Sequence, residues 1–326
     1  MTPHRETPSF DVLAVGEVDV SRPDHAIDMP RSQSGANPQH LIVTLLGDYW
    51  SRCTEHLPSA ALVALASEFG ITSTSARAAL SRLARRGLLE SSKSGRRTSY
   101  GLTPRAARVL NEGFARIVDF GLHHGPWNGS WSVVIFSVPE DQRDVRHTLR
   151  NQLRWLGFAP LYDGVWVSPR ADVQQTARVL ERFGVASATL LVSRVAHAIN
   201  GGEPLSAWDI DSLRESYMQF VDRFGPLLDR IDAGDVGLAE ALVERTRVMD
   251  VWRQFPNLDP ELPEDVLGEA WPRDDARAIF ARVYDALGPL AEMRFRQVLA
   301  EHDQPLAERA CHRTTASEGA PPSARR

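Results

Sequence analysis

The residues best suited to a chemical role are the cations between positions 71 and 116. This segment holds ten basic residues, opposed by only two acids, Glu90 and Glu112. The chain as a whole has a formal net charge of −5, and residues 204–303 contain 21 acidic residues against 11 arginines. Basic residues gathered in one segment of an otherwise acidic protein are typical of a surface that neutralises phosphates. The pattern therefore indicates binding to a nucleic-acid backbone.

The same segment carries side chains suited to reading bases. On a helix expected over 73–86, an inward face of Ala76, Ala79, Leu80 and Leu83 leaves small polar residues on the opposite face. Small residues let a helix approach the floor of the major groove, where an arginine can pair with the two acceptors of guanine. Basic residues at the helix end and beyond it suit phosphates. We therefore predict a DNA-binding surface of Thr74, Ser75, Arg77, Ala78, Ser81, Arg82, Arg85, Arg86, Lys93, Arg96 and Arg97. The plainer alternative is a solvated basic face without a ligand.

The elements expected to position these residues form a winged helix. Apolar periodicity predicts helices near 41–50, over 58–69 and over 73–86, and Gly70 and Gly87 end the last two. Thr72 or Ser73 can cap the third helix. Two short β-type runs follow at 88–91 and 98–102, joined by a polar loop that contains Gly95. Three helices and a basic hairpin predict a winged helix-turn-helix domain over residues 37–113.

Two further domains are expected, which makes the chain an α+β protein. Residues 114–198 predict strand, helix, two strands, helix and strand, with a hairpin turn at Asp163-Gly164. This is the ferredoxin-like βαββαβ order, and we expect its sheet to pair two subunits. Residues 199–303 predict an all-helical domain whose last helix is long and includes Ile279 and Leu290. The polar segments 1–36 and 304–326 are predicted to be disordered tails.

A buried arginine in the helical domain is the candidate for ligand binding. Arg245 lies beside Leu242 and Met249 on a stripe that should face inward, and a buried guanidinium needs a partner. That partner is either an acid of the same domain or an anionic ligand such as a coenzyme A phosphate. We assign Trp252 and Trp208 to the same effector site, with membership of the core as their plainer interpretation.

Several separated motifs resemble those of PaaX-type regulators, repressors of phenylacetic acid catabolism and related pathways. The resembling segments are LIVTLLGDY at 41–49, RAALSRL at 77–83, GRRTSY at 95–100, WNGSW at 127–131, WLGF at 155–158, GVWVSP at 164–169, DPELP at 259–263 and WP at 271–272. The resemblance implies a homodimer on an inverted-repeat operator of double-stranded DNA. It also implies release by a small-molecule effector such as phenylacetyl-coenzyme A.

The middle domain of this family also resembles small CRISPR-associated ferredoxin-like nucleases, which place an acid near the end of their first strand to bind metal. Here Glu140 and Asp141 follow the first strand, so a metal-dependent nuclease or RNA-processing factor is the alternative function. Acids just before a helix are more simply explained by the positive end of its dipole. A scaffold whose basic patch meets an acidic protein is a second alternative, and an activator role is also compatible with the sequence.

The remaining composition argues against other classes of protein. No apolar run approaches the roughly 18 residues of a membrane span, and the acidic N-terminal residues do not form a secretory signal. Cys53 and Cys311 lie far apart without metal-type spacing, which predicts reduced thiols in a cytoplasm. No catalytic constellation stands out, so we expect no enzyme activity, cofactor or metal site. We predict a cytoplasmic repressor of a catabolic operon, released by an aryl- or acyl-coenzyme A thioester.

Overall fold

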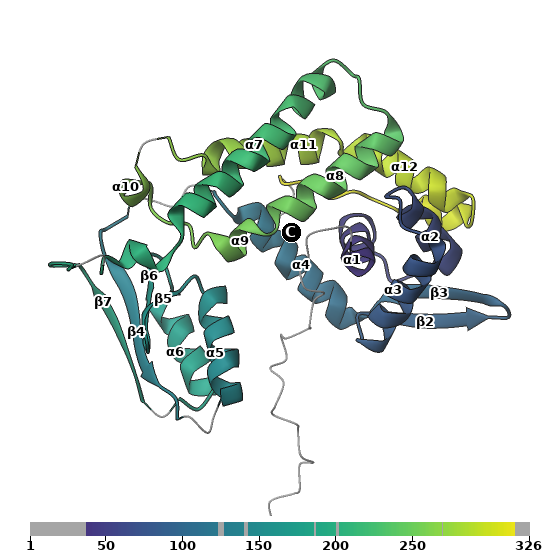
Figure 1. The fold of residues 1–326 in the computed structure, drawn as a ribbon. Coiled ribbons are helices and arrows are strands. Elements are labelled where there is room, and N and C mark those ends of the chain that lie inside the picture. Colours follow the sequence, from purple (N-terminus) through teal and green to yellow (C-terminus); the bar gives the residue numbers. More distant parts are fainter. Residues whose placement is uncertain are drawn as a thin grey trace, which may run out of the picture.

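The computed structural model describes residues 37–122, 127–139, 143–185, 187–199, 202–268 and 270–316. Helices form the N- and C-terminal parts and a small sheet forms the centre, so the protein has the expected α+β class (Figure 1). The predicted N-terminal tail, and the predicted C-terminal tail beyond residue 316, lie outside the described residues. Within the described ranges, no helix combines the length and apolar character needed to cross a bilayer.

The first elements are three helices and a small antiparallel sheet. They are α1 (Pro38–Tyr49), β1 (Leu57–Pro58), α2 (Ser59–Ser67), α3 (Ser73–Arg85), β2 (Leu89–Ser94) and β3 (Arg97–Leu102), with the strands in the order β1-β3-β2. The Thr72 hydroxyl accepts a hydrogen bond from the backbone N–H of Ser75 and begins α3. Gly87, with a φ of 70°, lets the chain turn out of the end of α3. Helices and hairpin thus lie close to where the sequence predicted them, but β2 extends to Ser94, beyond its predicted end at Ser91, and the short β1 was not predicted.

Helix α4 (Pro104–Asp119) connects this part to the rest of the chain. Its C-terminal end is held by two side chains of the C-terminal helices. The Trp252 indole donates to the Ile117 carbonyl at 3.2 Å, and Arg277 donates to the carbonyls of Val118 and Phe120, both at 3.0 Å. The boundary predicted after residue 113 therefore falls inside a continuous helix.

The central domain follows the predicted order of strands and helices. Its elements are β4 (Trp131–Ser137), α5 (Arg143–Trp155), β5 (Ala159–Tyr162), β6 (Val165–Ser168), α6 (Val173–Arg182) and β7 (Ser187–Ser193). All neighbouring strands are antiparallel, in the order β5-β6-β4-β7. Helices α5 and α6 cover one face of this sheet (Figure 1). The predicted hairpin turn joins β5 to β6, and Gly164 has a φ of 75° there.

The C-terminal part is helical, as predicted. It contains η1 (Pro204–Ala207), α7 (Ile210–Asp232), α8 (Leu238–Trp252), α9 (Phe255–Leu258), α10 (Glu264–Leu267), α11 (Arg273–Ala286), α12 (Gly288–Ala300) and α13 (Gln304–Ala307). The predicted long last helix is wrong, because it is divided into α11 and α12 at Leu287. Pro289 has no backbone N–H to continue the hydrogen bonding of α11, so a new helix starts there.

Residues 304–316, which we call the C-terminal strap, are packed against the helices. Ala310 and Arg313 are buried, with 0% and 2% of their surface exposed. The His312 backbone donates to Glu292 of α12 at 2.8 Å, and Arg313 donates to Asn111 of α4 at 2.9 Å. The disorder predicted for this segment is therefore wrong. Its polar composition suggested a solvated tail, but its polar groups have specific partners in distant helices.

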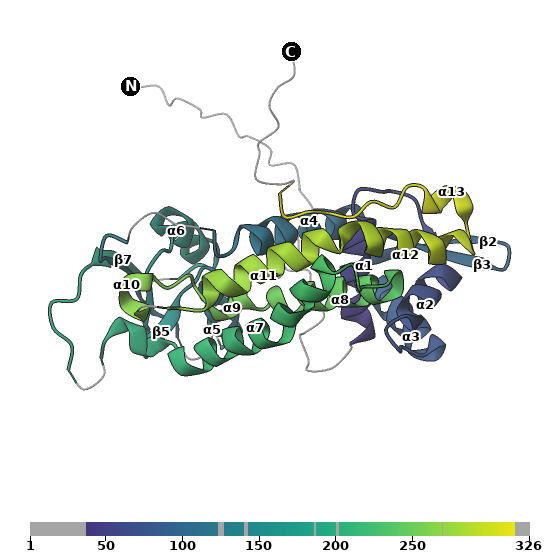
Figure 2. The same ribbon diagram turned by 90° about the horizontal axis from the view of Figure 1, so that it is seen from above.

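Helix α1 is buried on every side. Each residue from 40 to 49 is buried, and the Tyr49 ring stacks on Phe295 of α12 with centroids 4.8 Å apart. One hydrophobic core therefore runs from α1, α2 and α3 into α7, α8, α11 and α12, and a second core lies between the central sheet and its helices. The N- and C-terminal blocks, predicted as separate domains, pack as one body. The β2–β3 hairpin lies at one end of the molecule and the central sheet at the other (Figure 2).

Candidate nucleic-acid interface

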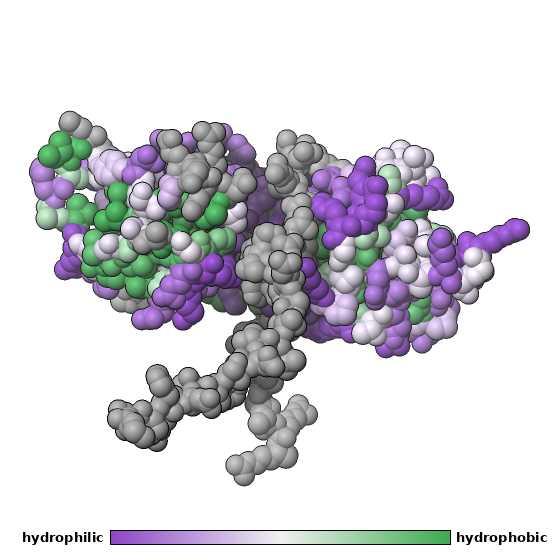
Figure 3. Space-filling model, turned by 90° about the horizontal axis from the view of Figure 1, so that it is seen from below, coloured by the Kyte–Doolittle hydropathy of each residue, from purple (hydrophilic) through white to green (hydrophobic). Residues whose placement is uncertain are grey.

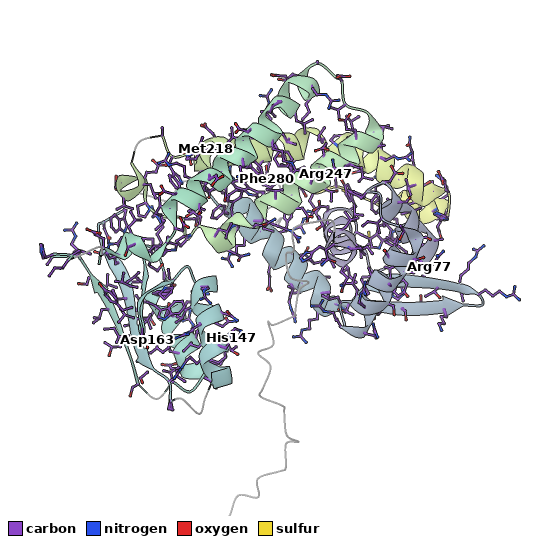
Figure 4. The ribbon with its side chains drawn as sticks, viewed as in Figure 1. Arg77, His147, Asp163, Met218, Arg247 and Phe280 are labelled. Carbon is purple, nitrogen blue, oxygen red and sulfur yellow. The ribbon has the colours of Figure 1, made fainter. Side chains whose placement is uncertain are left out.

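Helix α3 presents the predicted base-reading face to solvent. Its apolar side chains Ala76, Ala79, Leu80 and Leu83 are completely buried against the helical core. On the other side of α3 and at its end, all predicted contact residues are exposed: Thr74, Ser75, Arg77, Ala78, Ser81, Arg82, Arg85 and Arg86. Arg77 lies on α3 (Figure 4). The inward stripe thus orients the helix so that its small and basic residues point outward together.

The β2–β3 hairpin carries the other predicted cations. Strands β2 and β3 are paired from Leu89↔Leu102 to Ser94↔Arg97, so only Gly95 and Arg96 form the turn. Gly95 has a φ of 60°, a value that glycine favours at the first position of a two-residue hairpin turn. The hairpin projects beyond the helices (Figures 1 and 2), and Lys93, Arg96 and Arg97 are exposed. Its tip can therefore reach a neighbouring groove or phosphate.

Six cations of this surface form no ion pair within the described part of the chain. Across the described ranges, no ion pair joins a carboxylate to Arg77, Arg82, Arg85, Lys93, Arg96 or Arg97. Glu90, the acid closest to them in sequence, lies instead within 3.2 Å of the His56 ring. The Arg86 guanidinium donates to Gln39 at 3.5 Å. The positive charge of Arg77, Arg82, Arg85 and the three hairpin cations remains available to an external anion.

Arg245 is wholly buried, as predicted, but its partners are protein groups. Its guanidinium lies 3.5 Å from the Asp48 carboxylate of α1 and donates to the backbone carbonyls of Tyr284 at 3.0 Å and Arg313 at 2.6 Å. It also stacks 3.7 Å from the centroid of the Tyr284 ring, whose hydroxyl donates to Asp48 at 2.9 Å. The assignment of Arg245 to the effector site is therefore wrong, because protein groups already satisfy its guanidinium.

The electrostatics of this cluster follow from its burial. Desolvation raises the pKa of the Asp48 carboxyl above its ordinary value, against the opposing effects of Arg245 and of the Tyr284 hydroxyl. Desolvation likewise raises the pKa of Tyr49 to about 12. Asp48 was not predicted as a partner of Arg245, because it belongs to the first block and not to the helical domain. The sequence feature that could have identified it is a single carboxylate within an otherwise apolar segment.

The second predicted effector residue, Trp252, is also part of the core. It is completely buried and stacks on Phe280, with ring centroids 5.0 Å apart. Trp208 differs, because it lines a cavity of about 320 Å³ where the central domain meets the C-terminal helices. The other lining residues are Arg154, Gly157, Phe158, Ala159, Pro160, Ala207, Asp209, Ser212, Leu213, Ser216, Pro256, Asn257, Leu258 and Pro260. Of the three predicted effector residues, Trp208 is the one that lines a cavity in the described part of the chain.

The structure describes no metal site that would favour a nuclease. Glu140 and Asp141, the acids on which that alternative rests, lie outside the described residues. Among the residues that are described, no three His, Cys, Asp or Glu side chains gather as metal ligands would.

The chain is similar to known proteins along most of its length. Residues 37–106 match the family described as "PaaX-like protein", residues 124–204 the "PaaX protein central Cas2-like domain" and residues 208–297 the "PaaX-like protein C-terminal domain". The "Transcriptional repressor PaaX" of Escherichia coli (strain K12) is 26% identical over 261 residues, which cover 77% of this chain and 80% of that protein. A solved structure of an uncharacterized protein from Mycobacterium tuberculosis is 22% identical, with a TM-score of 0.49, and the match covers 83% of this chain and 98% of that one. The three family matches follow one another in the order of the three parts described above, and the chain belongs to the PaaX family of regulators.

Proposed function

We propose that this protein is a transcriptional repressor that binds double-stranded DNA through a winged helix-turn-helix formed by residues 37–113. The observation that carries the proposal is the exposed surface of α3 and the β2–β3 hairpin, whose cations point to solvent. Membership of a family of regulators indicates a regulator and not an enzyme. The repressing sign of regulation is supported by the name of the Escherichia coli relative.

In this proposal α3 enters the major groove and the hairpin follows the backbone. Arg77 contacts a base edge, since it lies among the small exposed residues of α3. Arg97 and its neighbours on the hairpin contact phosphates, which position the protein without reading sequence. Two copies of the chain would place their α3 helices about 34 Å apart, or a multiple of it, on an inverted repeat.

The test is DNA binding to the region upstream of the protein's own gene, measured by fluorescence anisotropy over a range of salt concentrations. Arg77→Ala is expected to cost about 1–3 kcal/mol on the specific site and to relax preference at one base pair. Arg97→Ala is expected to weaken specific and random DNA alike and to reduce the salt slope by about one. Arg178→Ala is the matched control, because Arg178 is also exposed but lies on α6 of the central domain.

Two outcomes would contradict this assignment. If Arg178→Ala weakened DNA binding as much as Arg97→Ala, the interface would not be confined to α3 and the hairpin. If Arg97→Ala changed base preference while Arg77→Ala did not, the division of roles between the two would be wrong.

We further propose that the central domain, as a ferredoxin-like sheet, pairs two subunits. Strand β7 is an edge strand, with Leu191 and Val192 44% and 62% exposed and Ile135 of the adjacent β4 42% exposed. An exposed apolar edge strand invites pairing with another chain. Figure 3 shows hydrophobic residues gathered at the end of the molecule that holds the central domain, whereas the hairpin at the other end is hydrophilic. A second copy of the chain, required by an inverted repeat, is the partner that fits this surface.

The cavity beside Trp208 is the proposed effector site. Its wall combines apolar side chains such as Phe158 and Leu213 with the guanidinium-bearing Arg154 and several polar groups. Such a lining suits an organic acid or thioester with an apolar body, and an aryl- or acyl-coenzyme A thioester of a catabolic pathway is the ligand class we propose. A volume of about 320 Å³ accommodates the acyl part of such a ligand and not the whole molecule.

The segment formed by α9 and the loop after it links this cavity to the proposed DNA-binding part. Pro256, Asn257 and Leu258 of α9, and Pro260 in the loop that follows it, line the cavity. The next residue, Glu261, accepts a hydrogen bond from the backbone N–H of Gly121 at 2.9 Å, just after α4, and from Arg170 of the central domain at 3.1 Å through its carbonyl. A ligand that displaces this segment would therefore shift the end of α4 through the Glu261–Gly121 hydrogen bond. Helix α4 directly follows β3 of the hairpin in the chain. A tenfold loss of operator affinity requires the ligand to favour the released state by about 1.4 kcal/mol.

A further inference from the structure

The two cysteines of the chain are brought to one place by the C-terminal strap. Cys53 lies just after α1, in the segment that leads to β1, and Cys311 lies in the strap. The Cys53 thiol donates to the carbonyl of Arg309, two residues before Cys311, at 3.6 Å. The backbone N–H of Cys311 donates to the carbonyl of Tyr49 at 3.3 Å. Residues that are distant in sequence thus lie on two adjoining stretches of backbone.

The two stretches are held together by further contacts. Arg309 of the strap forms an ion pair with Glu55 at 2.5 Å, and the carbonyl of Glu55 accepts from the Trp50 indole at 2.8 Å. Both thiols are free, and Cys53 is half-buried while Cys311 is exposed. Burial raises the pKa of the Cys53 thiol, and the neighbouring charges of Glu55 and Cys311 raise it further. Cys311 is therefore the thiol that an oxidant in solution meets first.

We propose that Cys53 and Cys311 form a reversible disulfide that fastens the C-terminal strap to the segment between α1 and β1. Hydrogen peroxide is the oxidant. The Cys311 thiolate attacks one peroxide oxygen, the O–O bond breaks, and hydroxide leaves to take up a proton as water. The Cys53 sulfur then attacks the sulfenic sulfur of Cys311, the S–S bond forms, and the second oxygen leaves as water. The two thiols lose two electrons and two protons, and the peroxide is reduced to two waters.

The disulfide would restrict movement between the hairpin and the C-terminal helices. The segment after α1 continues into β1, which pairs with β3 of the hairpin through Leu57↔Tyr100. The strap is tied in turn to α8, because Arg245 donates to the Arg313 carbonyl. A disulfide between the two therefore fixes the base of the hairpin to the C-terminal helices. Disulfides in a reducing compartment are usually transient and redox-sensing, which is the use that this placement favours.

The test uses the purified full chain, reduced and then exposed to a small excess of hydrogen peroxide. Remaining thiols are alkylated, and the protein is digested with trypsin without reductant. We expect residues 53–77 to be linked to residues 310–313 within a monomeric chain, with the loss of two hydrogen atoms, and the link to disappear on adding dithiothreitol. The oxidised protein should melt higher than the reduced one by several degrees, because the closed loop is long.

Cys53→Ser and Cys311→Ser serve as matched controls, and each should lose the rise in melting temperature while keeping the melting temperature of the reduced wild type. Three results would overturn the proposal. These are both thiols remaining open to alkylation after peroxide, oxidation of Cys311 to a sulfinic acid without a link, and a disulfide formed only between two chains. None of these readouts involves DNA or effector, so the disulfide and the proposed repressor function can fail separately.

Discussion

Replacing Asp48 by alanine would remove the carboxylate of the buried ion pair that joins α1 to α8. The side chains of Asp48 and Arg245 are 4% and 0% exposed, so water cannot replace the lost partner. Arg245 would keep the carbonyls of Tyr284 and Arg313, but its charge would face no anion. The Tyr284 hydroxyl would lose its acceptor as well. The change in the free energy of unfolding of this variant therefore measures how much the link between α1 and α8 stabilises the shared core.

The expected cost follows from the geometry. Removing one partner of a buried pair costs about 3–5 kcal/mol, because the other charge is left uncompensated. The free energy of unfolding should fall by that amount, which corresponds to a drop in melting temperature on the order of 10 °C. Adding Arg245→Met should recover part of the loss, since a buried pair can be replaced by apolar side chains with little net cost.

The assay is urea unfolding followed by tryptophan fluorescence for the wild type, Asp48→Ala, Arg245→Met and the double variant. A double-mutant cycle gives the coupling energy, which we expect to exceed about 1 kcal/mol. Asp222→Ala is the control, because Asp222 is exposed on α7, and it should stay within about 0.5 kcal/mol of the wild type. If Asp48→Ala behaved like this control, or if the two substitutions were simply additive, the pair would not hold α1 in place.

Three further predictions concern other parts of the molecule. Leu191→Glu, a change on the exposed β7 edge, should weaken self-association at least tenfold (about 1.4 kcal/mol) in sedimentation velocity; an unchanged dimer would place the interface elsewhere. Trp208→Ala should leave operator affinity intact but weaken the response to acyl-coenzyme A thioesters by roughly tenfold, and an unaltered titration would exclude the cavity as the effector site. Burial alone would raise the pKa of Glu292, but hydrogen bonds from the His312 backbone and ring hold it below its ordinary value. The contribution of ionised Glu292 to the free energy of unfolding is therefore fully present above about pH 4.5 and is lost as the pH falls through the lowered pKa. The denaturation curves of the wild type and Glu292→Gln should converge on acidification.

The parts of the fold that follow from local pattern were predicted well. Helix α3 and the hairpin are set by short-range features, namely the stripe of Ala76 and Leu80, the cap at Thr72 and the glycine after the helix. The order of elements in the central domain follows from its strand lengths and from the turn at Gly164. The exposure of the predicted DNA-binding residues follows once the apolar stripe is assigned to the buried face of α3.

The parts that depend on distant contacts were not predictable in the same way. The sequence showed that Arg245 needed a partner but not that Asp48, on a helix of another block, would supply it. It showed polar residues after 303 but not that Arg313 would be buried over the ring of Phe114, 3.6 Å from its centroid. In each case the stabilising partner lies far away in the chain, where periodicity carries no information. The same holds for the proximity of the two cysteines.

The shared core restricts how the proposed effector could release DNA. A swinging motion of the N-terminal block away from the C-terminal helices would separate α1 from α8 and α12, and would break the Asp48–Arg245 pair and the stack of Tyr49 on Phe295. Loss of the buried pair alone would cost about 3–5 kcal/mol, more than the 1–3 kcal/mol that a typical effector supplies. The helices and the DNA-binding surface must therefore move together. The central domain has a core of its own, and the cavity beside Trp208 lies where it meets the helices. In the proposed dimer, a change of angle at that junction would alter the spacing of the two proposed DNA-binding surfaces without opening either core, and this is the motion that the proposed effector could drive.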